Sequence, residues 1–260
     1  LAHTGKPVLG VVPYLRDLGL PEEDSVGFKQ GVFDDCAATR DQVDIAVIDL
    51  PHISNFTDFD ALRAEPDVRL RVVRTPGELR SPSAVILPGS KNVPGDLRFL
   101  SETGLAAAIK QLAADGRSEI VGICGGYQML GERIEDPYRL ESDGTTEAAL
   151  GLLRVSTTLE REKTLTRTTA QHIDSGLDVV GYEIHHGQTT TGTSGEVLRG
   201  ANAEPMGARS ANGLVWGCYL HGIFDTDAFR RWYIDRLRVR RGLAALERIA
   251  VRYDIEPALD

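Results

Sequence analysis

Short apolar runs separated by amphipathic stretches recur along most of the chain. Beginning near Gln42, the apolar runs are VDIAVIDL, RLRVVRT, AVILPG, EIVGICGG and, much later, GLVWGCYLHG. The stretches between them include DFDALRAE, DLRFLSETGLAAAIKQLAADG and YQMLGERI, which have the spacing and end signals of helices. Strands that alternate with helices predict parallel βαβ units. We therefore expect an α/β fold with a mostly parallel sheet and helices on both faces.

The pattern changes between about residue 150 and residue 193, where threonine and turn-forming residues are common. The segments LLRVSTTLE and DVVGYEIHHGQT alternate apolar and polar residues, which is typical of half-buried strands. We expect these segments to form an extra β-rich layer beside the parallel sheet. Farther on, TDAFRRWYIDRLRVRRGL predicts a terminal helix that begins at an N-cap threonine followed by aspartate and docks on the core.

The first apolar run, KPVLGVVPYL, predicts a buried strand that precedes the alternating pattern. The polar, turn-rich span 20–42 that follows it is the predicted domain boundary. We expect residues 41–240 to form one domain. Residues 1–40 are expected to be the end of a preceding domain plus a linker, and residues 241–260 a C-terminal tail.

Composition narrows the function classes. The net charge of −9 disfavours nucleic acid and anionic membranes as partners. No run approaches the roughly 20 apolar residues of a membrane span, and the start of the chain lacks a signal-peptide pattern, so a cytoplasmic location is expected. Three widely spaced cysteines without a CxxC pair indicate neither a disulfide framework nor a cysteine zinc site, and no metal is expected. Cys36 and Cys218 have no flanking chemistry and are expected to be structural.

Cys124 stands where an apolar strand is predicted to turn sharply into a helix, in EIVGICGGYQMLGERI. Glycines at 122, 125 and 126 permit a tight bend and a close approach by a substrate, which is the geometry of a nucleophile elbow. The N-terminal end of the following helix would favour the thiolate form of the cysteine. A small buried hydrophobe is the alternative for this residue, but the glycines favour a nucleophile.

A catalytic cysteine of this kind needs a histidine, and His221 is the best placed of the six. It ends the apolar run WGCYLHG, and the C-terminal ends of parallel strands share one sheet edge, so His221 can lie beside Cys124. A hydrogen-bonded structural histidine is the alternative. His185 and His186, in GYEIHHG, are rival bases or substrate contacts, and Glu183 would share a strand face with His185.

The acid that would orient His221 is left open by the sequence. The residue two positions after it is Ile223, which cannot accept a hydrogen bond, so Asp58 and Asp225 are the candidates. Asp58, in SNFTDFD, follows the strand IAVIDL and should emerge at the same sheet edge as the cysteine. A helix N-cap is the alternative for Asp58.

The turn GSKN, after the strand AVILP, can aim backbone amides into the same cleft. Together with the Gly125 amide, the backbone at Gly89 and Ser90 would suit an oxyanion hole. Gln128 belongs to the same predicted substrate-binding set. Lys91 is expected either near this cleft or simply in solvent.

Taken together, LPGSKN, GICGGYQMLG and YLHGIFD resemble the class I glutamine amidotransferases, and specifically the cobyric acid synthase type of the cobalamin pathway. The match spans roughly Leu9 to Leu237. The stretches VVPYL, LPEEDSV, LPHISNFTDFDAL and GYEIHHG, and the run from PGSKN to GDLRFL, are particular to that subgroup. Two residues depart from its pattern: the family usually shows methionine where His186 stands, and the acid partner of His221 is not the usual glutamate.

The resemblance implies a flavodoxin-like domain that hydrolyses glutamine through a thioester on Cys124, with His221 as the base. It also implies a P-loop domain that uses ATP and Mg to activate side-chain carboxylates of a corrinoid, adenosylcobyrinic acid a,c-diamide, and receives the ammonia under cover. This sequence contains no GxxxxGK[ST] motif, so we expect no cofactor in this chain, and ATP and Mg in a separate synthetase domain or subunit. The opening LAHTGKPVLGVVPYL looks like the end of that domain, so we expect a fragment, a cleavage product or half of a split enzyme.

Three alternatives remain. The same chemistry can serve another acceptor, either in cobyrinic acid a,c-diamide synthesis or in amidation of a cell-wall lipid precursor, although SNFTDFD favours cobyric acid. A hydrolase of γ-glutamyl peptides would use the same thioester without a synthetase. A binding module with an inert or redox-active Cys124 is the alternative from a different class.

Overall fold

A computed structural model describes residues 39 and 41–253 of the chain. The predicted first strand KPVLGVVPYL, most of the predicted boundary before Gln42, and Cys36 lie outside these residues. The limits predicted for the preceding domain and for the C-terminal tail therefore stay predictions.

A six-stranded sheet forms the centre of the molecule, with strand order β13-β14-β6-β4-β1-β3. The pairings among β14, β6, β4, β1 and β3 are parallel, and β13 runs antiparallel to β14. The predicted apolar runs supply the parallel strands, which have almost no exposed residues because both faces of the sheet are covered. The bounds are β1 (Val43–Ile48), β3 (Val68–Val73), β4 (Ala84–Leu87), β6 (Glu119–Ile123), β13 (Ala208–Arg209) and β14 (Val215–Cys218).

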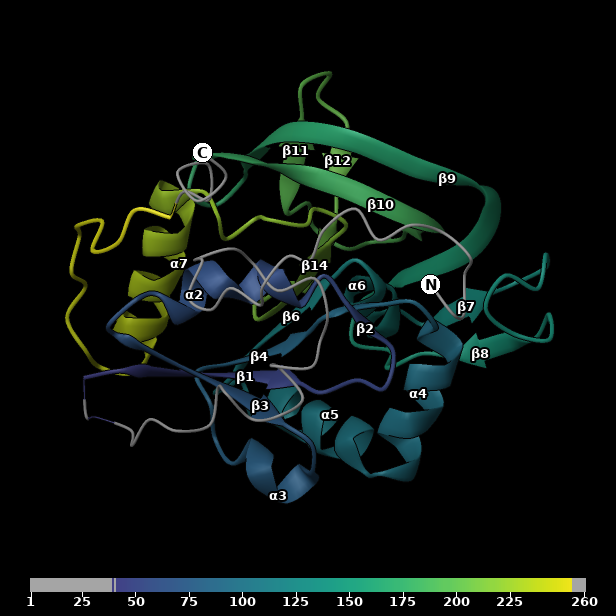
Figure 1. The fold of residues 1–260 in the computed structure, drawn as a ribbon, viewed down its shortest axis with the longest axis horizontal. Coiled ribbons are helices and arrows are strands. Elements are labelled where there is room, and N and C mark those ends of the chain that lie inside the picture. The colour runs from purple at the N-terminus through teal and green to yellow at the C-terminus, as the bar shows by residue number, and fades with distance from the viewer. Residues whose placement is uncertain (1–38, 40, 254–260) are drawn as a thin grey trace, which may run out of the picture.

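Helices lie on both sides of this sheet, with α3 and α5 below it and α2 and α6 above it in Figure 1. The predicted α/β fold is confirmed. No helix in the described ranges is long and apolar enough to span a membrane. The helices are η1 (Phe56–Phe59), α2 (Asp60–Arg63), α3 (Pro76–Leu79), α4 (Val93–Glu102), α5 (Leu105–Asp115), α6 (Gly125–Leu130) and α7 (Asp227–Arg240).

Two helix predictions differ from the structure. The run DLRFLSETGLAAAIKQLAADG forms two helices rather than one, because Gly104 adopts a left-handed conformation (φ 80°) between α4 and α5. The segment YQMLGERI is helical only as far as Leu130. The chain then becomes extended at Gly131, and Arg133–Glu135 form strand β7, which pairs with two other strands.

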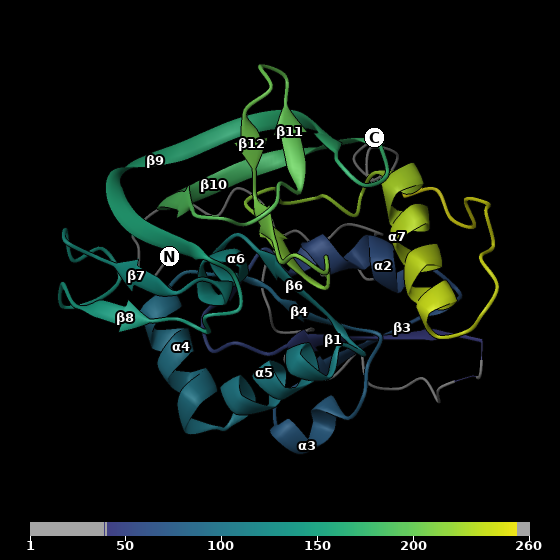
Figure 2. The same cartoon turned by 180° about the vertical axis from the view of Figure 1, so that it is seen from behind.

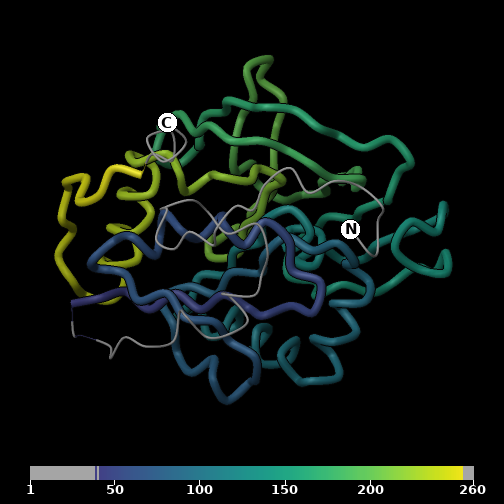
Figure 3. Tube along the Cα trace, viewed as in Figure 1, coloured from purple at the N-terminus to yellow at the C-terminus, as the bar shows by residue number. Residues whose placement is uncertain are grey.

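The predicted β-rich layer is a second sheet with strand order β12-β11-β9-β7-β8, to which β10 is added by pairing with β9. Strands β9 and β10 form a long antiparallel hairpin on the α2 and α6 side of the central sheet. Figure 3 follows the chain from the central sheet into this hairpin and back to the sheet. The strands are β7 (Arg133–Glu135), β8 (Thr146–Ala148), β9 (Val155–His172), β10 (Asp178–Thr191), β11 (Leu198–Gly200) and β12 (Pro205–Met206); β2 (Ile53–Ser54) and β5 (Gly89–Ser90) form a separate antiparallel pair.

The terminal helix α7 docks on the core, as its spacing predicts. Thr226 is the N-cap residue, but its hydroxyl does not cap the helix and instead accepts a hydrogen bond from the Val180 amide at 3.2 Å. Arg230, which lies between the aromatic positions of the helix, is fully buried and pairs with Glu65 at 2.8 Å. Its guanidinium also donates to the carbonyl of Val251, which ties the segment after α7 back onto the helix.

The turn from β6 into α6 is tight and holds Cys124 in a left-handed conformation, with φ 51° and ψ −108°. L residues rarely adopt such a backbone, and its cost is commonly about 1–3 kcal/mol. Packing keeps the turn in place: a Cβ added to Gly126 would collide with the carbonyl of Leu87 in β4, and one added to Gly122 would lie 2.6 Å from the Gly126 carbonyl. The glycines therefore let α6 rest directly on the sheet.

Replacing Gly126 by alanine should disturb this contact. We expect Gly126→Ala to lower the free energy of unfolding by about 1–3 kcal/mol, because the new methyl meets backbone that cannot move aside cheaply. Gly77→Ala in α3 is the matched control, since a Cβ there meets nothing within 4 Å. It should be neutral or slightly stabilising. Urea denaturation measures both, and equal effects would contradict this account of the turn.

Strain at Cys124 can be tested with two variants that both lack the thiol. We expect Cys124→Gly to be more stable than Cys124→Ala by about 1 kcal/mol, because glycine relieves the positive φ by more than its conformational entropy costs. The same denaturation experiment compares them. An alanine variant as stable as the glycine variant would show that the turn carries no strain.

Candidate active site

The predicted site residues come from segments that follow four neighbouring parallel strands. Cys124 directly follows β6, His221 lies just after β14, Ser90 lies on β5 just after β4, and Asp58 lies in η1 after β1 and β2. Because the C-terminal ends of parallel strands meet at one edge of a sheet, these segments converge there. The structure brings all four residues to this edge.

His221 and Asp58 form a buried pair. The Nδ1 atom of His221 lies 2.7 Å from a carboxylate oxygen of Asp58, and the other oxygen accepts the Gly222 amide at 2.9 Å. The two side chains are at most 4% exposed. A carboxylate accepts, so Nδ1 donates and the opposite nitrogen, Nε2, is free for chemistry. Nε2 is buried and has no hydrogen-bond partner of ordinary geometry among the described residues.

This geometry distinguishes between the two candidate acids, Asp58 and Asp225. Asp58 lies inside η1, whose N-cap is Asn55, so the alternative N-cap role is not what the structure shows. Asp225 makes no hydrogen bond with the imidazole among the described residues, and its amide donates to the Gly222 carbonyl at 2.9 Å. Burial, together with the nearby Asp58 carboxylate, raises the pKa of Asp225 to about 7.

The protonation of His221 depends on opposing effects. Burial disfavours the charged imidazolium, but the charge and hydrogen bond of Asp58 and the adjacent Cys124 side chain outweigh it, so that the pKa of His221 rises to about 10. Cys124 acts on the ring both through its charge and as a hydrogen-bonding group. A cationic imidazole beside a cysteine is the arrangement that stabilises a thiolate.

The backbone of Ser90 lies against the residue that follows the cysteine. A Cβ built on Gly125 would lie 2.8 Å from the Ser90 nitrogen, so the backbone of these two residues is in close contact beside Cys124. A Cβ on Gly89 would lie 3.1 Å from Cε1 of His221, which shows that this glycine makes room for the imidazole. The Ser90 hydroxyl donates to Asp96 at 2.6 Å, and this anchors the turn that carries the amide.

A pocket of about 340 Å³ opens at Cys124. Its lining comes from the β2–β5 pair, the elbow at Cys124 with α6, the loop between β7 and β8, and the β9–β10 hairpin. This volume is at the lower end of the range for small-molecule sites. The lining residues are Ser54, Asn55, Ser90, Lys91, Val93, Cys124, Gly125, Gln128, Leu140, Glu141, Lys163, Ile184, His185 and His186.

Gln128 presents an unused acceptor beside this pocket. Its Nε2 atom donates to the Tyr219 hydroxyl at 3.3 Å, and Tyr219 is held in turn by the Thr189 hydroxyl at 2.6 Å. The Oε1 atom of Gln128 is buried and has no partner among the described residues. An orphan buried acceptor is costly, so a ligand that donates there would be favoured.

The rival bases His185 and His186 line the pocket but are otherwise engaged. His185 lies between the Gly187 carbonyl (2.8 Å) and Glu183 (3.2 Å), so Glu183 and His185 share a face as expected. The Nδ1 atom of His186 donates to the Glu160 carbonyl at 2.9 Å. Neither imidazole contacts Cys124 through a hydrogen bond within the described part of the chain. No three metal-ligating side chains are grouped there either.

The remaining predicted residues are placed as follows. Cys218 is fully buried, and this burial raises the pKa of its thiol to about 12, which makes it a poor nucleophile at neutral pH. Lys91 is exposed at the rim of the pocket.

The sequence analysis missed two residues, Tyr182 and Asp96. The ring of Tyr182 stacks on His221 with 5.2 Å between centroids. Asp96 lies in the quoted GDLRFL run, but nothing in that run marks it as a buried acceptor.

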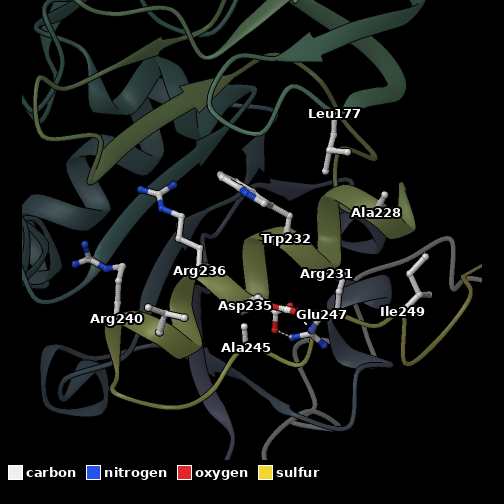
Figure 4. A pocket seen from close by; sticks show the side chains of 11 residues that line it. Leu177, Ala228, Arg231, Trp232, Asp235, Arg236, Arg240, Ala245, Glu247 and Ile249 are labelled. Carbon is white, nitrogen blue, oxygen red and sulfur yellow. Dashed lines mark hydrogen bonds and ion pairs between the residues drawn. The ribbon is translucent and has the colours of Figure 1, made fainter.

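A larger pocket of about 700 Å³ lies along α7, away from these residues (Figure 4). Its arginines already have partners: Arg231 donates to Asp235, Arg236 to the Gly213 carbonyl, and Arg240 to the Gly116 carbonyl. No predicted site residue lines it. The predicted site residues that line a pocket, among them Cys124, Ser90 and Gly125, line the smaller one.

Known proteins resemble this chain over most of its length. The profile of the CobB/CobQ-like glutamine amidotransferase domain matches residues 44–229. A bifunctional adenosylcobalamin biosynthesis protein, CobDQ, of Leptospira interrogans is 50% identical over 99% of this chain and 30% of its own length. A cobyric acid synthase of Nitratidesulfovibrio vulgaris is 48% identical over 99% of this chain and 55% of its own length. The chain thus spans about half or less of these relatives.

Solved structures show the same fold at low sequence identity. A glutamine amidotransferase superposes with a TM-score of 0.56 at 18% identity, covering 74% of this chain and 97% of that one. The structure of PurLQS from Thermotoga maritima gives 0.53 at 17% identity, covering 72% of this chain and 89% of the matched one. The fold, the match over residues 44–229 and the identity to these relatives lead to one conclusion: the chain belongs to the CobB/CobQ-like glutamine amidotransferase domain family.

Proposed function

We propose that this chain is the glutaminase part of an ATP-dependent amidotransferase of the cobyric acid synthase type. The observation that carries the proposal is the convergence of the strained Cys124, the His221–Asp58 pair and the backbone at Ser90 and Gly125 at one sheet edge, where Cys124, Ser90 and Gly125 also line a pocket. Nucleophile, base, orienting acid and oxyanion donors are the parts that acyl transfer through a thioester requires.

The reaction would begin when the sulfur of Cys124 gives its proton to His221, whose raised pKa favours the imidazolium. The sulfur attacks the side-chain amide carbon of glutamine, and the amides of Ser90 and Gly125 stabilise the oxyanion. His221 then protonates the leaving nitrogen, the C–N bond breaks, and ammonia departs from a thioester. Water, deprotonated by His221, attacks the thioester and releases glutamate, and the thiolate is restored.

The use of the ammonia lies beyond the described residues. Relatives named cobyric acid synthase are about twice as long as this chain, so we propose that the remaining part, as a domain or subunit, binds ATP and Mg and phosphorylates carboxylates of a corrinoid acceptor. Ammonia would pass to it under cover, because ammonia released into bulk water is protonated and lost as a nucleophile. A cytoplasmic location would suit an enzyme whose Cys124 must stay reduced.

The proposal is tested by glutamate release from glutamine, measured with and without a synthetase domain of the cobyric acid synthase type, ATP, Mg and corrinoid. We expect Cys124→Ala to lose at least about 10⁴-fold in kcat, because the nucleophile forms the intermediate. Cys218→Ala is the matched control, and it should keep nearly full activity because that thiol is buried away from the pocket.

The outcomes separate the alternatives. Release that rises when the synthetase domain and corrinoid are present supports the proposal, whereas equal inactivity of wild type and Cys124→Ala in both settings points to a binding module. Release without any partner, together with cleavage of γ-glutamyl peptides, would indicate a hydrolase. Stimulation only by a synthetase for another acceptor would change the acceptor but keep the chemistry.

The His221–Asp58 pair predicts a pH dependence. The pKa of His221 is raised from 6.5 to about 10 in the folded chain, so its stabilising contribution is full below pH 6.5 and is lost as pH rises through about 10. We expect Asp58→Asn to lower this pKa, because burial is then opposed by Cys124 alone. The stability difference between wild type and Asp58→Asn should be largest near pH 6 and shrink towards pH 10.

Two measurements check this pair: NMR titration of labelled histidine side chains, and urea denaturation at several pH values. A His221 that titrates in wild type near its ordinary value would contradict the assignment. A stability difference that grows with pH would do the same.

A further inference from the structure

The hairpin strand β10 meets the segment that carries His221 at Gly181 and Tyr182. The Tyr182 amide donates to the His221 carbonyl at 3.1 Å, and the His221 amide donates to the Tyr182 carbonyl at 2.8 Å. This close approach requires glycine at position 181, because a Cβ there would collide with the His221 carbonyl. The first two residues of the GYEIHHG segment therefore bring the hairpin directly onto the backbone of His221.

The ring of Tyr182 also contacts the imidazole of His221. The two rings stack with 5.2 Å between centroids and an angle of 21° between their planes. The hydrogen bond from Nδ1 to Asp58 fixes one nitrogen, but by itself it leaves the imidazole free to tilt about that bond. A second contact on the ring face removes this freedom. The other nitrogen, Nε2, which is available for proton transfer, thereby keeps one direction.

The hydroxyl of Tyr182 reaches the turn that carries the acid. It accepts the side-chain amide of Asn55 at 2.6 Å. Asn55 is the N-cap residue of η1 and has a left-handed backbone, with φ 53°, and its carbonyl accepts the Asp58 amide at 3.0 Å. A backbone in this region persists only where the surroundings hold it in place. Tyr182 therefore contacts the imidazole with its ring and the start of η1 with its hydroxyl.

Tyr182 acts on these groups without lining the pocket at Cys124. Burial, together with the nearby Asp58 carboxylate, raises the pKa of Tyr182, so the phenol stays neutral at physiological pH. A neutral side chain outside the pocket lining brings no charge to a ligand bound there. Its influence on the chemistry must pass through His221 and Asp58.

We propose that Tyr182 is a positioning residue for the His221–Asp58 pair, an inference that rests on the proposed function. Its ring sets the plane of the imidazole, and its hydroxyl, through Asn55, sets the turn that carries the carboxylate. A displacement of about 1 Å at a catalytic group can cost about 100-fold in rate, so these contacts have a measurable effect. The β9–β10 hairpin is then part of the proton-transfer machinery and not only a cover for the pocket.

The kinetic test measures glutamate release by the full chain with the synthetase domain, ATP, Mg and corrinoid. Tyr182→Phe keeps the ring but removes the hydroxyl, and it should lower kcat about 3- to 10-fold, the usual effect of losing one hydrogen bond. Tyr182→Leu also removes the stacked ring, and it should lower kcat about 30- to 100-fold. KM should change less than about 2-fold in both variants, because Tyr182 does not line the pocket.

A double-mutant cycle shows whether the hydroxyl acts through Asn55. Asn55→Gly removes the side-chain amide and suits the left-handed backbone at this position. In that background, Tyr182→Phe should lower kcat less than about 2-fold further, because its partner is already gone. Tyr233→Phe is the matched control, since it removes a buried hydroxyl with no hydrogen-bond partner among the described residues, and it should leave kcat unchanged.

The Nδ1 proton of His221 gives a second signal that does not depend on turnover. In the full chain with 15N-labelled histidine, NMR should show this proton exchanging slowly with water, and Asp58→Asn should abolish the signal. Exchange should become at least about 3-fold faster in Tyr182→Phe and at least about 10-fold faster in Tyr182→Leu, because the imidazole leaves Asp58 more often. Tyr233→Phe should leave the exchange unchanged.

The outcomes are separable. In an active assembly, an unchanged kcat in Tyr182→Phe would overturn the inference, and so would a rise in KM at constant kcat, which marks a substrate contact. Tyr182→Phe decides the question by itself if Tyr182→Leu fails to fold. If wild type releases no glutamate in any setting, the proposed function fails, and proton exchange at Nδ1 then decides the positioning role: faster exchange in Tyr182→Phe supports it, and unchanged exchange overturns it.

Discussion

The direct contact of α6 with the central sheet is the constraint on which the site depends. Gly126 lies against the Leu87 carbonyl, and Gly122 lies against the backbone of α6, so the helix begins immediately after β6. This leaves Cys124 a left-handed backbone and turns its side chain toward the sheet edge. The strain is tolerated because the surrounding sheet packing offers the chain no other path.

A second constraint is electrostatic. The His221–Asp58 pair is almost fully removed from water, where an unpaired charge would be very costly. The pair is retained because each group compensates the other and because the Gly222 amide holds the remaining carboxylate oxygen. Tyr182 covers one face of the imidazole, donates its amide to the His221 carbonyl, and accepts the Asn55 amide on its hydroxyl. These contacts hold the hairpin against the sheet edge at which Cys124 and His221 lie.

The two sheets contribute different parts of the candidate site. The central sheet presents the reactive groups at the C-terminal ends of its strands, whereas the β-rich layer and its loops close the pocket and supply Lys163 and the loop that carries Glu141. At the other edge, arginines of α7 bind the segments that precede the strands: Arg238 donates to the Asp41 carbonyl, and Arg240 to the Gly116 carbonyl.

Local sequence patterns determined the strands of the central sheet, the β-rich layer, the elbow at Cys124 and the position of His221 at a strand end. These features depend on residues close together in the chain, such as apolar runs and flanking glycines. Only the tertiary structure decided between Asp58 and Asp225, because Asp58 and His221 are 163 residues apart and their contact depends on strand order. Long-range packing likewise determines the surroundings of Glu141, Tyr182 and the free oxygen of Gln128. Nothing in their own segments shows which groups from other parts of the chain will lie beside them.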